Sequence, residues 1–193
     1  GVLHVTTDYL GCPASAVSAQ QLADAYGALL PTPRMVDAIW AAANVKLAPQ
    51  PIPGGTAMPA AQAAAQHEAM IKGQLAGRSG LIAGNKKDIV LSAKLVPGKV
   101  AIYGWHQLTG KPLYLGHSAS YADYSHGVRL VASTMTVDGV ERRVADVLAD
   151  PELAALVSHE GPVAPRYPGI APGPQPYSLA SASPTWALGG LVA

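Results

Sequence analysis

The sequence predicts an α+β domain in which N-terminal helices pack on an antiparallel β-sheet, followed by an extended Pro-rich tail. Helical periodicity fills the first part of the chain, β-type residues dominate the middle, and proline recurs after Gly161. With 193 residues, 49% of them hydrophobic and 13% charged, the chain can build one buried core. We therefore expect a single domain over residues 1–160 and a tail over residues 161–193.

The chain begins with a predicted strand and a predicted helix. Residues 1–11, GVLHVTTDYLG, alternate in polarity and carry Val, Thr and Tyr, which favours a short strand. Residues 15–31 have apolar side chains at helical spacing, with Ser18 as the expected N-cap and Gly27 as the stop. The first strand is thus expected to lead into a helix.

Two further helices are predicted on either side of a proline-rich loop. Residues 32–45 begin with Thr32 as a cap and Pro33 at the first helical position, where proline is tolerated. Residues 46–59 hold several prolines and an adjacent pair of glycines, so they form a loop without regular structure. Residues 60–77 are rich in alanine and end in glycine, which is typical of a helix and its stop.

The period of the pattern then changes from helix to strand. Strong β-formers separated by PG, TG and DG turn signals predict antiparallel pairing. The predicted strands cover residues 88–95, 99–108, 111–116 and 127–143. Residues 144–158, VADVLADPELAALVS, predict a last helix before the tail.

Charge and hydropathy exclude two classes of partner. Lysine and arginine number 13 against 12 aspartates and glutamates, and no basic run exceeds two residues, so nucleic acid is not an expected partner. The sequence has no run of about 18 apolar residues, so no membrane span is expected. The single cysteine, Cys12, has no intramolecular disulfide partner.

Residues 116–130, GHSASYADYSHGVRL, gather side chains suited to proton transfer. His117 and His126 flank Asp123, and imidazole changes protonation near neutral pH. His106 ends another predicted strand, so the three histidines could converge at one edge of the sheet. We expect His117 or His126 to act as a base that Asp123 orients.

Neighbouring polar and aromatic residues are candidates for substrate binding. They are His106, Trp105, Tyr124, Ser125 and Arg129. A zinc site built from the histidines and Asp123 is a weaker alternative, because no compact zinc signature such as HExxH is present. No cofactor is therefore expected.

Part of the chain resembles the NlpC branch of papain-like cell-wall peptidases. The similar segments are GCPASAVSAQQLADAYGALLPTPRMVDAIW and KKDIVLSAKLVPGKVAIYGWHQLTGKPLYLGHS, which together span roughly residues 10 to 120. In that family a cysteine opens a helix and a strand supplies a histidine, so the resemblance makes Cys12 a candidate nucleophile. A helix N-terminus lowers a thiol pKa, which suits this role. Lys99 stands where the family's histidine is expected.

Two other resemblances concern the later motifs. YSHGVRLV is similar to the SHGC signature of L,D-transpeptidases, but Val128 replaces the cysteine, so that chemistry is not carried over. The phrases LLPTPRMVDAIW, GNKKDIVLS, VAIYGWH and YADYSHGVRLV resemble an uncharacterised group of exported bacterial proteins. This resemblance implies a secreted or periplasmic location.

The sequence therefore predicts a hydrolase that cleaves a peptide or amide bond of an extracellular polymer, with peptidoglycan as the leading candidate. One alternative is a noncatalytic protein that binds or supports the cell wall. A further alternative is a polysaccharide lyase, in which a Tyr/His pair would abstract a proton next to a uronate carboxylate and Arg129 would stabilise the enolate-like state.

Overall fold

The structure, a computed structural model, describes residues 1–10, 13–52, 58–106 and 113–173, and the backbone of residues 188–192. Its elements are β1 (Val2–Thr6), α1 (Ala16–Ala25), α2 (Pro33–Ala42), β2 (Val45–Lys46), α3 (Ala60–Leu75), β3 (Ile82–Ala83), β4 (Lys87–Ile89), β5 (Ile102–Gly104), β6 (His126–Gly127), β7 (Val131–Val137), β8 (Val140–Arg143), α4 (Val144–Ala149), the 3-10 helix η1 (Ala154–Leu156) and β9 (Leu188–Val192). The predicted α+β class is confirmed.

Three small sheets build the part of the molecule that the structure describes. The largest is antiparallel with the order β8-β7-β1-β9, and the others are β5-β4-β6 and β2-β3. Strand β4 runs antiparallel to β5 but parallel to β6, and β2 and β3 are also parallel. Besides the predicted antiparallel pairs, the sheets thus contain two parallel pairs, β2 with β3 and β4 with β6. Each parallel pair joins segments that are distant in the sequence.

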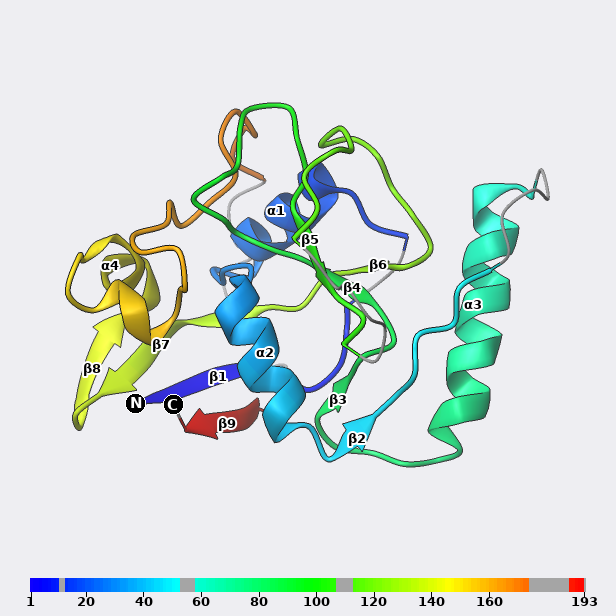
Figure 1. The fold of residues 1–193 in the computed structure, drawn as a ribbon, viewed down its shortest axis with the longest axis horizontal. Helices are drawn as coiled ribbons and strands as arrows, with labels where there is room; N and C mark the ends of the chain where they lie inside the picture. The colour runs from blue at the N-terminus through cyan, green and yellow to red at the C-terminus, as the bar shows by residue number, and fades with distance from the viewer. Residues whose placement is uncertain (11–12, 53–57, 107–112, 174–187, 193) are drawn as a thin grey trace.

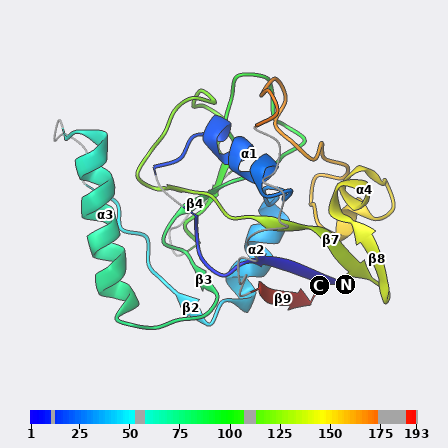
Figure 2. The same cartoon turned by 180° about the vertical axis from the view of Figure 1, so that it is seen from behind.

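The elements spread along the long axis of the molecule. In both views the four-stranded sheet and α4 lie at one end, and α3 stands at the other end beside β2 and β3 (Figures 1 and 2). Helix α2 lies in front of β1 in one view and behind it in the other, so it covers one face of that sheet. The region between these ends holds α1 and the sheet β5-β4-β6.

Helix caps explain where two of the helices begin. Thr32 accepts a hydrogen bond from the Met35 amide and Pro33 follows it, as predicted for α2. Helix α1 is capped by Ser15 and not by Ser18 as predicted. Ser18 occupies the third helical position, where its hydroxyl accepts from the Ser15 amide and completes a capping box.

One main hydrophobic core joins the strands to α1, α2 and α4. Val5, Ile89 and Val131 are fully buried at its centre, and Ile39 of α2 packs on the same cluster. This core contains Ile89 of β4 and Val128, which follows β6, and the predicted site residues from Asp123 to His126 lie directly before Gly127 of β6.

The start of the predicted tail lies against the body. Residues 161–173 contain no helix or strand, yet Tyr167 is only 1% exposed. Its hydroxyl donates to the Val90 carbonyl at 2.8 Å and accepts from the Ala101 amide at 3.1 Å. In the described part of the chain, no helix is long and apolar enough to cross a membrane.

Candidate functional site

His126 opens strand β6 and is held beside the residues that lead into α1. Its side chain is buried, and Nδ1 lies 3.1 Å from the carbonyl oxygen of Ala14. A carbonyl oxygen only accepts hydrogen bonds, so Nδ1 carries the proton and Nε2 keeps its lone pair. The imidazole is thereby fixed in the tautomer that a general base requires.

The surroundings of His126 favour its neutral form. Burial lowers the pKa of His126, and the negative charge of Asp123 only partly opposes this effect. The neighbouring ring of His117 lies 6.3 Å away between centroids and adds to the lowering. At neutral pH His126 is therefore an uncharged imidazole, ready to accept a proton.

Asp123 organises the turn that precedes β6. It accepts hydrogen bonds from the Ser125 amide at 2.8 Å, from the Ser125 hydroxyl at 2.6 Å and from the Tyr121 hydroxyl at 3.0 Å. Burial alone would raise the pKa of Asp123, but these bonds hold it below its ordinary value. Asp123 is thus an ionised turn residue at neutral pH.

Two predicted roles in this turn are corrected. Asp123 was expected to orient a histidine, but the Nδ1 partner of His126 is the Ala14 carbonyl, and Asp123 acts on it through charge. Ser125 was expected to bind substrate, but it is 1% exposed and its hydroxyl closes the turn on Asp123. Both side chains therefore stabilise the turn that precedes β6.

Arg129 is a core residue and not the predicted substrate-binding cation. It is fully buried, and its terminal nitrogens each donate at 2.6 Å, one to the Thr6 carbonyl and the other to the Ile82 carbonyl. Its Nε lies 3.5 Å from Oδ1 of buried Asp88, and its guanidinium stacks over Tyr9 at 4.2 Å. With its donors directed inward, Arg129 leaves the lyase alternative without its cation.

His106 and Trp105 also face the interior. His106 Nε2 lies 2.8 Å from Asp37 of α2, and the imidazole stacks on Trp40 with centroids 5.0 Å apart. Trp105 is 8% exposed and donates from Nε1 to the Asn85 carbonyl at 3.3 Å. The predicted substrate contacts of both residues are therefore replaced by packing, and His106 joins a cluster on α2.

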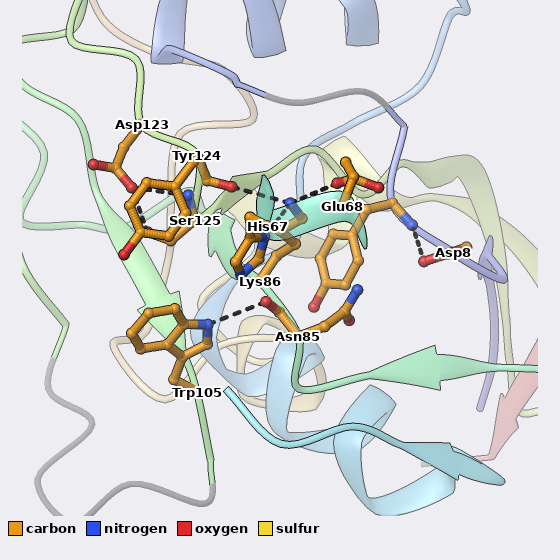
Figure 3. A network of polar contacts seen from close by, with 10 residues as sticks. Asp8, His67, Glu68, Asn85, Lys86, Trp105, Asp123, Tyr124 and Ser125 are labelled. Atoms are coloured by element: carbon orange, nitrogen blue, oxygen red, sulfur yellow. Dashed lines mark hydrogen bonds and ion pairs between the residues drawn. The ribbon is translucent and has the colours of Figure 1, made fainter. Parts of the chain in front are cut away.

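Lys86, which was not among the predicted site residues, is the centre of a buried polar network. Its ammonium contacts His67 Nδ1 at 2.8 Å, Glu68 Oε1 at 2.8 Å and the Tyr124 carbonyl at 3.0 Å. Figure 3 shows these groups converging on one nitrogen, with Trp105 alongside. Lys86 is only 3% exposed. Its contacts connect α3, which carries His67 and Glu68, to the turn that precedes His126.

The network fixes the protonation of His67. Because Lys86 can only donate, His67 Nδ1 accepts, and the ring proton is on Nε2. Burial and the nearby positive charge of Lys86 lower the pKa of His67 to about 4. Tyr124, predicted to bind substrate, instead accepts on its hydroxyl from the Ile52 amide at 2.8 Å.

A sequence signal for this network did exist. Lys86 and Asp88 stand where a predicted strand begins, and Arg129 lies in the apolar run GVRLV. Charges placed inside apolar strands are buried only when they are paired. Their partners, however, come from segments that no local pattern connects to them.

The remaining predicted groups are a thiol and a metal site. Cys12 lies outside the described residues. Among the residues that the structure describes, no group of three or more His, Cys, Asp or Glu side chains is arranged to hold a metal ion.

No protein-family model matches this chain, and no curated protein or solved structure is significantly similar to it.

Proposed function

We propose that this chain is a hydrolase of peptide or amide bonds, with Cys12 as the nucleophile and His126 as the general base. One observation carries the proposal: the neutral His126 imidazole is anchored to the carbonyl of Ala14. Ala14 follows Cys12 by two residues and precedes Ser15, the cap of α1. A thiol close before a helix and a neutral imidazole are the groups that thiol hydrolases combine.

The proposed reaction has two half-reactions. The Cys12 thiol gives its proton to His126 Nε2, the sulfur adds to the substrate carbonyl carbon, and the carbon–nitrogen bond breaks as the imidazolium protonates the amine. A thioester remains. Water then loses a proton to His126 and attacks the thioester, the carbon–sulfur bond breaks, and the carboxylic acid and the thiol are released.

The proposed substrate is peptidoglycan, and the proposed location is outside the bacterial cytoplasm. The support for both is the resemblance of motifs within residues 10 to 120 to those of cell-wall peptidases. The second candidate function is noncatalytic binding to the cell wall. It is favoured by the structural roles of Ser125 and Arg129, whose polar groups are used within the fold.

Release of new amino groups from purified peptidoglycan tests the proposal. His126→Asn is a suitable variant, because an amide can still donate to the Ala14 carbonyl but cannot act as a base. We expect His126→Asn and Cys12→Ser each to lower the rate by at least about 100-fold with an unchanged melting temperature. His159→Gln, at an exposed position, is the matched control and retains the wild-type rate.

Two results would contradict the proposal in different ways. Full activity in Cys12→Ala, which has no side-chain nucleophile, would exclude the thiol and leave water as the nucleophile. Absence of amine release by the wild-type chain, together with its sedimentation with intact cell walls, would favour the noncatalytic alternative.

A further inference from the structure

Three aromatic side chains pack against one another beside His126. His117 stacks on Tyr121 with ring centroids 4.2 Å apart, and Tyr114 meets His117 edge-on at 4.9 Å. Tyr114 and Tyr121 are 45% and 40% exposed, so both rings are accessible to a ligand. We call these three residues the aromatic platform.

The fold holds the aromatic platform in one arrangement. The Tyr114 ring lies so close to Gly116 that a Cβ at this position would collide with its phenol oxygen. Lys99 donates to the Gly116 carbonyl at 3.1 Å and fixes this turn. At the other side, the Tyr121 hydroxyl donates to Asp123 at 3.0 Å. Exposed rings that are held at both ends form a prepared surface and need little ordering on binding.

The aromatic platform borders the proposed catalytic base. The His126 ring lies 5.8 Å from that of Tyr121 and 6.3 Å from that of His117, between centroids. Ala119, between these rings in sequence, accepts a hydrogen bond from the Val17 amide in the first turn of α1. A ligand on the platform would therefore lie beside the start of this helix and beside His126.

We propose that the aromatic platform binds a sugar ring of the substrate. A pyranose has an apolar face of C–H groups, which packs on aromatic rings, and an edge of hydroxyl groups. The platform has a matching edge, since the exposed hydroxyls of Ser118 and Ser120 lie 3.1 Å apart near His117, and ionised Asp123 lies beside Tyr121. The inference rests on the proposed function in taking the sugar as part of the same substrate, a peptide-bearing glycan.

Binding without turnover tests the inference. The probe is the soluble trisaccharide of β-1,4-linked N-acetylglucosamine, titrated into the full-length His126→Asn protein by calorimetry. We expect Tyr114→Ala and Tyr121→Ala each to weaken binding by about tenfold or more, because each removes one ring face. Tyr26→Ala, which removes a tyrosine that is 43% exposed at the far end of α1, is the matched control with unchanged affinity.

Gly116→Ala provides a second variant that removes no ring. It displaces Tyr114 by steric contact alone, so it weakens binding of the trisaccharide if the arrangement of the platform matters. Melting temperatures of all variants establish that they are folded.

The outcomes separate this inference from the proposed function. Trisaccharide binding that is lost in the platform variants supports the inference, even if no amine release is ever observed. No binding to the wild-type or His126→Asn protein, or equal binding by all variants, overturns it, even if the chain cleaves peptidoglycan. Platform-dependent binding of a sugar-free stem peptide, with none of the trisaccharide, overturns the assignment to sugar.

Discussion

Acidification should destabilise the fold through His67. The His67 side chain is fully buried, and its Nδ1 accepts a hydrogen bond from the Lys86 ammonium at 2.8 Å. A proton added to Nδ1 would place two cations in direct contact and remove that acceptor. Burial and Lys86 accordingly lower the pKa of His67 from 6.5 to about 4.

The size and sign of the effect follow from this difference in pKa. The unfolded chain binds a proton at His67 as the pH falls through 6.5, whereas the folded chain binds it only near pH 4. The contribution is therefore complete above pH 6.5 and is lost as the pH falls towards 4. A difference of 6.5 − 4, at about 1.4 kcal/mol for each pH unit, corresponds to roughly 3 kcal/mol.

Urea unfolding at pH 7, 6, 5 and 4 measures this loss. His67→Asn is the comparison, because its side-chain oxygen can accept from Lys86 but does not titrate. We expect the free energy of unfolding of the wild type to fall by about 3 kcal/mol more than that of the variant between pH 7 and pH 4. Parallel pH profiles, or a His67 NMR resonance that titrates near pH 6.5, would refute the reasoning.

Three further predictions concern buried polar groups. Arg129→Met should lower the free energy of unfolding by about 3–5 kcal/mol in urea titrations, because it removes the cation beside buried Asp88 and leaves the carbonyls of Thr6 and Ile82 without their donor. Burial raises the pKa of Asp88 to about 6, so on acidification the folded chain binds this proton at a higher pH than the unfolded chain does. The fold therefore gains stability from this group as the pH falls from about 6 to about 4. Asp88→Asn should abolish that gain, which is measured as the difference in unfolding free energy between the two pH values. Tyr167→Phe should cost about 1–3 kcal/mol in the same assay, because the Val90 carbonyl and Ala101 amide lose a buried partner, and an unchanged stability would contradict this.

Local signals predicted the helices well. The Thr32-Pro33 pair marked the start of α2, and α3 lies within the predicted residues 60–77. The cap of α1 was misplaced by one turn because both Ser15 and Ser18 can cap, and the capping box uses both. Caps depend on a few adjacent residues, so sequence reasoning finds them to within about a turn.

Pairing between distant strands was beyond local reasoning. Residues 113–116 of a predicted strand form a single bridge, Tyr114 with Ile102, and the partners of β1 come from the last third of the chain. Hydrophobic alternation indicates that a segment is a strand but not which strand lies beside it.

The candidate site shows the same difference between contacts within one segment, which could be predicted, and contacts between distant segments, which could not. His117, Asp123 and His126 were predicted to lie together, and they do, because they belong to one short segment of the chain. His106 was expected beside them, but Asp37 on α2 supplies its carboxylate partner. The contact between Lys86 and His67 likewise joins a strand to α3, and no pattern within either segment specifies the other.

The position of β1 in its sheet has a consequence for biosynthesis. Val2–Thr6 lies between β7 and β9, whose residues 131–137 and 188–192 are translated long after it. Such pairing spans most of the chain, and a high average sequence separation of contacts slows folding. A nascent chain that stops short of β7 has no neighbour for its first strand, so the polypeptide should remain protease-sensitive on the ribosome until its last third emerges.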